Sequence, residues 1–320
     1  MDLQQGNATV APAHARQAQA NGRQAQTAFA PAHGRQAQGT PSSAAPAAPT
    51  RPRASKIVAS HIDKAYEAAK GKGTLAVHDV SLEIREGEFV CIVGPSGCGK
   101  STILRMLAGL DFPTAGTITL DGRVIEGPGP DRGMVFQTYT LFPWMSVEDN
   151  IKFGPKNKGL PAAEQQALAD RYLKVIGLEQ FARAYPKELS GGMKQRVAIA
   201  RALANKPEVL LMDEPFGALD PHTKSMMQLL MRQIWEAERP TVVFITHDIE
   251  EAVYLASSVY VMSAHPGTVI ERVEVPLPEH RELSLRDAPE FVALRRTLND
   301  LLYAGDDAIA GGDPCPDGAR

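Results

Sequence analysis

The residues best suited to chemistry form a glycine-rich loop directly after an apolar run at 89–93. Glycines let the backbone curl so that successive N–H groups point at an anion, and a helix beginning there adds partial positive charge. In the pattern G-x-x-x-x-G-K-[ST], Lys100 would reach the β- and γ-phosphates of a nucleotide, and Ser101 would offer its hydroxyl to Mg²⁺. The loop therefore predicts a phosphate cradle made of Gly94, Pro95, Ser96, Gly97, Cys98, Gly99, Lys100, Ser101 and Thr102.

Two adjacent carboxylates follow a second apolar run, V-L-L-M at 209–212. Asp213, at the end of this expected strand, would hold Mg²⁺ through water. Glu214, one residue on, would project toward the γ-phosphate and polarise an attacking water, as a general base or by orienting it. The pair predicts nucleotide hydrolysis.

A second anion-binding helix start is expected within the run L-S-G-G-M-K-Q-R, residues 189–196. Ser190, Gly191 and Gly192 precede the helical run at 197–203, so that a serine cap and free N–H groups would meet an anion. A chain with two phosphate-binding helix ends, set in different subdomains, predicts that two copies meet head to tail over shared nucleotide.

The surrounding pattern predicts the elements that position these residues. Residues 76–84 and 115–120 alternate in hydropathy like antiparallel strands, and the insertion at about 141–204 is mostly helical. Continuous apolar runs typical of buried parallel strands lie at 89–93, 209–212, 241–246 and 259–262. The predicted fold class is therefore α/β, a P-loop NTPase core with an antiparallel β subdomain and an inserted helical subdomain.

The ends of the chain differ from its body. Residues 1–55 contain five Arg against one Asp, a near-repeat and many Ala, Gln, Pro and Gly, which predicts a disordered low-complexity tail. A nucleotide-binding domain is expected over 56–280 and an extension over 281–320, with one short helix at 289–303 and a frayed end. Without the tail the chain carries a net charge of −7 and no dense basic patch, which disfavours nucleic acid as a partner.

Three scattered cysteines argue against a cysteine metal site and a disulfide scaffold. The lack of 18 consecutive apolar residues argues against a membrane-spanning helix. The cysteines have neither metal-site spacing nor a disulfide framework, and Cys91 is expected in the core. Nothing in the sequence is expected to span a membrane.

Over residues 57–280 the sequence resembles the ATP-binding subunits of ABC transporters. The run 189–196 is similar to their signature motif, which contacts the γ-phosphate of ATP held by the other subunit. The resemblance implies further roles for Gln137 (Q-loop, linking Mg²⁺ to the membrane partner), Asp220 (D-loop, at the dimer interface), His247 (switch histidine, at the γ-phosphate) and Tyr66 (stacking on adenine).

A finer resemblance is to the nitrate, sulfonate and taurine importer group. The runs 127–133, 142–150 and 265–267 carry it, followed by Arg281, although Glu279 and His280 stand where Arg-Pro is more usual. It implies ATP hydrolysis coupled to uptake of a small anion by a homodimer with two integral-membrane permease subunits. An extracytoplasmic solute-binding protein would act indirectly, and the ATPase would lie peripherally on the cytoplasmic face of the inner membrane. Trp144 would dock a permease helix.

Several alternatives stay open at this point. One is a soluble ABC-type ATPase acting on nucleic acid or ribosomes, although neither a coiled coil nor a second cassette is visible. Another is an importer of a different small solute. Export is disfavoured by the lack of a fused membrane domain, and a GTPase by the lack of aspartate after Asn157-Lys158.

Overall fold

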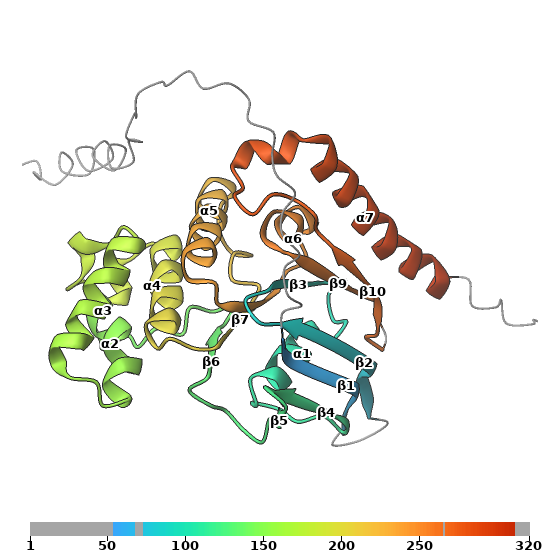
Figure 1. Cartoon of the computed structure of the whole chain (residues 1–320), viewed down its shortest axis with the longest axis horizontal. Helices are drawn as coiled ribbons and strands as arrows, with labels where there is room; N and C mark the ends of the chain where they lie inside the picture. The colour runs from blue at the N-terminus through green and yellow to red at the C-terminus, as the bar shows by residue number, and fades with distance from the viewer. Residues whose placement is uncertain (1–53, 68–72, 265, 311–320) are drawn as a thin grey trace, which may run out of the picture. The chain divides into compact units, whose positions relative to one another are not determined.

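Two β-sheets position most of the residues discussed above, which lie largely in loops and helix starts next to the strands (Figure 1). The computed structural model describes residues 54–67, 73–264 and 266–310, with side chains up to residue 303. Six strands form the larger sheet in the order β10-β9-β3-β8-β7-β6, and four form the smaller sheet in the order β2-β1-β4-β5. The α/β fold class predicted from the sequence is confirmed.

The larger sheet is parallel except at one edge. Its strands are β3 (Phe89–Val93), β6 (Arg132–Val135), β7 (Val209–Asp213), β8 (Thr241–Ile245), β9 (Ser258–Met262) and β10 (Val269–Glu274). Only the pairing of β10 with β9 is antiparallel. Parallel strands end at the same edge of a sheet, so the loops after β3, β6, β7 and β8 meet there.

Each face of this sheet belongs to a different hydrophobic core, which is why the central strands are apolar throughout. In β3, Phe89 and Cys91 face a core shared with α4 (Gly191–Ala204), α5 (Pro221–Glu238) and α6 (Ile249–Leu255). Their neighbours Val90 and Ile92 face the other core, with α1 (Lys100–Leu107) and the smaller sheet.

The smaller sheet is antiparallel throughout. Its strands are β1 (Ser55–Tyr66), β2 (Thr74–Arg85), β4 (Ala115–Leu120) and β5 (Arg123–Val124). In β2 the buried residues Val80, Leu82 and Ile84 alternate with exposed ones, as the pattern at 76–84 predicted. Strands β1, β5 and β6 were not predicted from the sequence.

Residues 141–204, all of them described, form helices and connecting turns. The helices are α2 (Val147–Asn157), α3 (Ala162–Val175) and α4, and between them lie the short 3₁₀ turns η1 (Glu179–Phe181) and η2 (Pro186–Glu188). Ile151, Tyr172 and Val197 are buried where the three helices pack. The chain enters and leaves this unit beside β6 and β7 (Figure 1). The domain boundaries at 56 and 280 stay predictions.

Beyond residue 263 the structure contains a strand that was not predicted and a helix longer than the one predicted. Three of the six residues of β10 are charged, two of them exposed, and they hide the hydrophobic alternation of an edge strand. After η3 (Leu283–Asp287), helix α7 spans Pro289–Ala310 and so continues past the predicted end at residue 303. Proline next occurs at 314, and Gly305 alone costs only about 1 kcal/mol within a helix. The predicted tail lies outside the described residues up to residue 53, as do residues 311–320.

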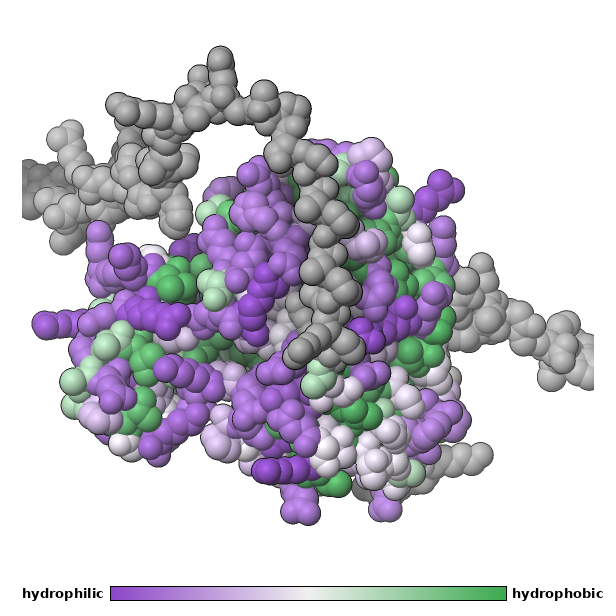
Figure 2. Space-filling view, in the orientation of Figure 1, coloured by the Kyte–Doolittle hydropathy of each residue, from purple (hydrophilic) through white to green (hydrophobic). Residues whose placement is uncertain are grey.

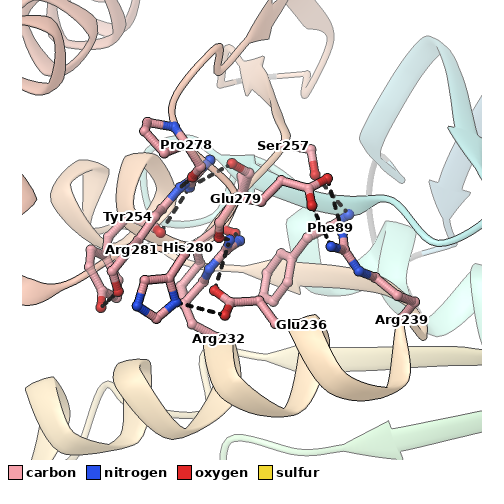
Figure 3. Close-up of polar contacts among 12 residues, drawn as sticks. Phe89, Arg232, Glu236, Arg239, Tyr254, Ser257, Pro278, Glu279, His280 and Arg281 are labelled. Atoms are coloured by element: carbon pink, nitrogen blue, oxygen red, sulfur yellow. Dashed lines mark hydrogen bonds and ion pairs between the residues drawn. The ribbon is translucent and has the colours of Figure 1, made fainter. Parts of the chain in front are cut away.

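A cluster of charged residues fastens the chain after β10 to α5 and α6 (Figure 3). Arg281 is 3% exposed and donates hydrogen bonds to the carbonyl oxygens of Pro278, Val253, Tyr254 and Ala256. We call the cluster the carboxyl-terminal clasp; its members are Arg232, Glu236, Arg239, Glu279, His280 and Arg281.

Glu279 and His280, which depart from the sequence of the importer group, both have partners at the carboxyl-terminal end of α5, where Arg239 is the residue that caps the helix. Arg239 Nη1 donates to Glu279 Oε1 at 3.1 Å, and His280 Nδ1 lies 3.1 Å from Glu236 Oε2. The departure from Arg-Pro is therefore accommodated by two contacts with one helix.

Among the helices of the described residues, none is both long enough and apolar enough to cross a bilayer. On the face seen in Figure 2, hydrophilic residues separate the hydrophobic ones into small patches.

Candidate nucleotide site

The glycine-rich loop predicted to bind phosphates, residues 94–102, runs from the end of β3 into α1, as its sequence predicted; we call it the P-loop. Gly97 and Gly99 have φ values of +81° and +91°, which side-chain-bearing residues rarely adopt. A Cβ on Gly99 would also lie 2.7 Å from a methyl carbon of Val77, so this position has no room for a side chain. Lys100 Nζ donates to the carbonyl oxygens of Gly94 and Pro95, both at 2.8 Å. The ammonium group is thus held within the loop that would surround the phosphates.

The two residues expected at Mg²⁺ are in direct contact. Ser101 Oγ donates to Asp213 Oδ1 at 2.9 Å, joining the start of α1 to the end of β7. Burial raises the pKa of Asp213 above its ordinary value, and the nearby charge of Glu214 adds to this, while the Ser101 hydrogen bond opposes it. A divalent cation would relieve this cost, and a hydroxyl plus a carboxylate is the oxygen donor set that Mg²⁺ uses beside nucleotide phosphates.

Gln137, the third residue expected at Mg²⁺, is exposed and follows β6 by two residues. Because β6 pairs in parallel with β7, this loop starts at the same edge of the sheet as Asp213. Among the described residues, no three His, Cys, Asp or Glu side chains form a dedicated metal cage. A cation held largely by substrate phosphates does not need one.

Glu214 and His247 meet across the ends of β7 and β8. His247 Nδ1 lies 3.1 Å from Glu214 Oε2. A carboxylate only accepts hydrogen bonds, so the contact places a proton on Nδ1 and leaves Nε2 for another partner. Glu214 has a φ of +40°, a left-handed conformation uncommon for this residue type and a recurrent feature of functional sites. The local backbone thus holds the carboxylate in place at some conformational cost.

Tyr66, at the end of β1, is placed less clearly. Its hydroxyl donates to Asp111 Oδ2 at 2.8 Å, and the residue is 39% exposed. The ammonium group of Lys64 lies 4.9 Å from the ring centroid. An exposed ring face is compatible with stacking on a base, and this role stays a prediction.

The signature residues lie at the start of α4, where the serine cap was predicted. Ser190 Oγ accepts a hydrogen bond from the backbone N–H of Met193 at 3.3 Å. A Cβ on Gly191 would lie 2.9 Å from the hydroxyl oxygen of Tyr139, and one on Gly192 would lie 2.5 Å from Thr223 Cγ2. A side chain at Gly192 would therefore displace Thr223, whereas one at Gly191 would need only a shift of the Tyr139 hydroxyl.

The structure brings the P-loop together with the switch histidine but not with the signature residues. A cavity of about 650 Å³ is lined by Gly94, Pro95, Ser96 and His247, among others. Of the described residues that line it, none comes from 189–196. Asp220 lies at the start of α5, where its carboxylate caps the helix through the N–H of Thr223 at 3.0 Å.

Sequence reasoning missed the residues behind His247, namely the buried Thr246 and Glu251 and the half-buried Lys224. A weak signal was present, because Asp248 and Glu251 have the three-residue spacing of a helix-capping pair. The contact of this pair with α5 has no sequence signature.

Comparisons with known proteins agree with this geometry. The family described as "ABC transporter" matches residues 77–217. The nitrate import ATP-binding protein NrtD of Synechocystis sp. is 49% identical over 75% of this chain and 92% of its own. The taurine import ATP-binding protein TauB of Rhizobium johnstonii is 46% identical over 77% of this chain and 96% of its own. A dimeric post-hydrolysis structure of the ATP-binding cassette MJ0796 with ADP and Pi superposes with a TM-score of 0.62, at 34% identity, over 69% of this chain and all of that one.

The chain therefore belongs to the ATP-binding proteins of ABC transporters, and it is an ATPase. Within that family it falls in the group that contains the nitrate and taurine import ATP-binding proteins. The family and the ATPase activity predicted from the motifs are confirmed.

Proposed function

We propose that two copies of this chain couple ATP binding and hydrolysis to uptake of a small anion such as nitrate, a sulfonate or taurine. The names of its relatives support the substrate class. The observation that carries the ATPase part is the convergence of three loops at one sheet edge. There Ser101 meets Asp213, and Glu214 meets His247.

The P-loop would bind the phosphates of ATP. Its backbone N–H groups would donate hydrogen bonds to the phosphate oxygens, and the start of α1 would stabilise their negative charge. The loop around the phosphates would be formed by Gly94, Pro95, Ser96, Gly97, Cys98, Gly99 and Thr102. Lys100 would exchange its two carbonyl contacts for the β- and γ-phosphate oxygens. Mg²⁺, held by Ser101, Asp213 and Gln137, would neutralise charge on those oxygens.

Glu214 would align the attacking water and take its proton. The water oxygen would bond to the γ-phosphorus as the bond between this phosphorus and the bridging oxygen of ADP breaks. The Nδ1 hydrogen bond fixes the tautomer of His247, so its Nε2 can face the γ-phosphate. Positioned proton transfer of this kind contributes about 10²–10⁴-fold to a rate. The products are ADP and phosphate.

The second copy would complete each site. Ser190, Gly191 and Gly192 lie outside the cavity at the P-loop of their own chain, which favours a role at the ATP held by the partner. Asp220 would lie at the contact between the copies. ATP would drive closure because it binds the closed pair better than the open one, and that difference in affinity sets the extent of closure.

Closure would reach two integral-membrane permease subunits through the surface around residues 137–150. Trp144 is 70% exposed, and its ring centroid lies 5.7 Å from that of Phe142. Beside them, a groove of about 720 Å³ is lined by Phe136, Phe142, Phe153 and Arg201, among others. A cytoplasmic permease helix would fill this groove, keeping the ATPase peripheral on the cytoplasmic face of the inner membrane. A solute-binding protein would deliver the anion on the opposite side.

Copurification tests the permease partner. Trp144→Ala should reduce recovery of an integral membrane protein with the tagged chain, because a central aromatic anchor often contributes 2 kcal/mol or more, about 30-fold in affinity. Phe112, 50% exposed between α1 and β4, offers a matched aromatic control as Phe112→Ala. Purification of the unmutated chain with RNA or ribosomes, and without a membrane protein, would contradict the proposal.

Growth of the native host tests the substrate class. Glu214→Gln in the chromosomal gene should abolish growth on sulfonates as sole sulfur source or on nitrate as sole nitrogen source. Loss on sulfonates alone would assign an organosulfur substrate, and loss on nitrate alone would assign nitrate. Normal growth on both would contradict uptake of either, with the exposed Glu271→Gln on β10 as control.

A further inference from the structure

A buried carboxylate lies directly behind the switch histidine. Glu251, on α6, is 3% exposed and four residues beyond His247. Its Oε2 accepts a hydrogen bond from the Thr246 hydroxyl at 2.5 Å, and its Oε1 accepts one from Gln228 Nε2 at 2.8 Å. The Lys224 ammonium lies 3.6 Å from Oε1. Both carboxylate oxygens are thus used inside the protein.

The residues on both sides of His247 are fixed by this group. Thr246 Oγ1, which donates to Glu251, also accepts the N–H of Asp248 at 3.0 Å. Asp248 Oδ1 accepts the N–H of Glu251 at 3.2 Å, and its Oδ2 accepts from Lys224 at 2.7 Å. The backbone entering and leaving His247 is therefore tied to one buried cluster.

The imidazole itself has little support. The His247 side chain is 57% exposed, and its recorded polar contact is the one with Glu214. Its position therefore depends on the backbone of Thr246 and Asp248 rather than on packing around the ring.

We propose that Glu251 is a positioning residue for ATP hydrolysis, acting through Thr246 to hold His247 against Glu214. This inference rests on the roles proposed above for Glu214 and His247. Glu251 is buried and does not line the cavity beside Gly94 and Ser96, whereas His247 and Asp248, the segment that it fixes, do.

Glu251 also connects helix α5 and the carboxyl-terminal extension to the segment around His247. Gln228, on α5, donates to Glu251 and accepts from the Arg286 guanidinium of η3. A line of hydrogen bonds thus runs from the carboxyl-terminal extension through α5 to Thr246. Asp220 caps α5, and the same helix carries Lys224 and Gln228, so α5 connects the D-loop with Glu251.

Charge balance explains why the carboxylate can be buried. Burial raises the pKa of Glu251, and the charge of Lys224 and the hydrogen bonds from Thr246 and Gln228 oppose that rise. For Lys224, burial lowers the pKa, but the charge of Glu251 and the contact with Asp248 raise it by more. The pKa of Lys224 therefore lies above its ordinary value, and the ammonium stays charged. The pair is mutually dependent.

The test compares variants of the full-length chain by phosphate release at varied ATP concentration. Glu251→Gln keeps the side-chain size but removes one acceptor oxygen and the charge facing Lys224. We expect kcat to fall about 10-fold, with the KM for ATP within about twofold, because a small misplacement of a catalytic group costs rate rather than binding. Thr246→Val should have the same effect, and Thr246→Ser, which restores the hydroxyl, should recover kcat.

Glu88→Gln is the matched control. Glu88 is also buried, at 5% exposure, and accepts from Ser258 Oγ at 2.7 Å, but it lies just before β3, at the opposite end of the strand from the P-loop. It should lower stability and leave kcat per folded molecule unchanged. A folding failure of Glu251→Gln leaves the Thr246 pair as the deciding measurement.

Two outcomes separate this inference from the proposed function. If His247→Ala loses turnover while Glu251→Gln or Thr246→Val keeps it, the positioning role is wrong. If His247→Ala itself keeps full turnover, the proposed role of His247 fails, and the inference fails with it. Equal loss in Thr246→Val and Thr246→Ser would also overturn the inference.

Discussion

The nucleotide site and the carboxyl-terminal clasp handle charge in opposite ways. In the clasp, Nε and Nη1 of the Arg281 guanidinium donate to four carbonyl oxygens of the same chain (Figure 3). Burial lowers the pKa of Arg281 to about 9, so it still carries its charge at neutral pH. In the nucleotide site, Glu214 and His247 are 23% and 57% exposed, and Glu214 adopts a left-handed backbone.

The difference separates stability from activity. Groups whose hydrogen bonds are complete within the chain contribute to the free energy of folding. Groups that have unused hydrogen-bonding capacity and unusual backbone geometry are those that bind a ligand or a partner. Substitutions in the clasp should therefore reduce stability, and substitutions in the site should reduce binding or turnover. Each prediction below tests one side of this contrast.

The largest effect is expected at Glu214. Glu214→Gln should lower the rate of phosphate release about 10²–10⁴-fold, because the amide cannot take the proton of water. ATP binding and the thermal midpoint should change little. Turnover within tenfold of the parent would show that another group performs this step.

Lys100→Ala should weaken ATP binding about 100–1000-fold, since hydrogen bonds to charged groups are worth roughly 1.5–3 kcal/mol each. Titration with a fluorescent ATP analogue measures this. Lys187→Ala, at an exposed position in η2, serves as the control. Unchanged affinity in Lys100→Ala would place the phosphates elsewhere.

Arg281→Met should sharpen the contrast from the other side. It leaves three carbonyl oxygens at the end of α6 and that of Pro278 without this donor, at a cost of about 2–4 kcal/mol in the free energy of unfolding. Urea denaturation gives that value, and kcat per folded molecule should stay within about twofold. A large loss of kcat without loss of stability would mean that the clasp acts on the switch directly.

The smallest effect is expected at the rim of the clasp. The ion pair of Arg239 and Glu279 has side chains 38% and 62% exposed, so solvent screens it. Glu279→Gln should change the free energy of unfolding by less than about 1 kcal/mol. A cost comparable to that of Arg281→Met would show that the clasp acts as one cooperative unit.

The sequence predicted the parts of the fold that have strong local patterns. Strands β3, β7, β8 and β9 are continuous apolar runs because both sheet faces are buried, and the P-loop is set by its own glycines. The short β6 contains glycine, and β10 is largely charged, so neither produces such a run.

The missed site residues have a different cause. Glu251, Lys224 and Gln228 come together only because α5 and α6 pack side by side. Periodicity along one helix places a residue on a face but does not identify its neighbour on another helix. The carboxyl-terminal clasp was missed for the same reason.

The shared nucleotide site is the central claim, and the mass of Glu214→Gln in saturating Mg-ATP tests it most directly. Light scattering after gel filtration should give twice the mass of one chain, falling to a single mass when ATP is omitted. The Lys100→Ala,Glu214→Gln double variant should stay single under both conditions. A single-chain mass for Glu214→Gln with ATP bound would contradict a site completed by Ser190 of a second copy.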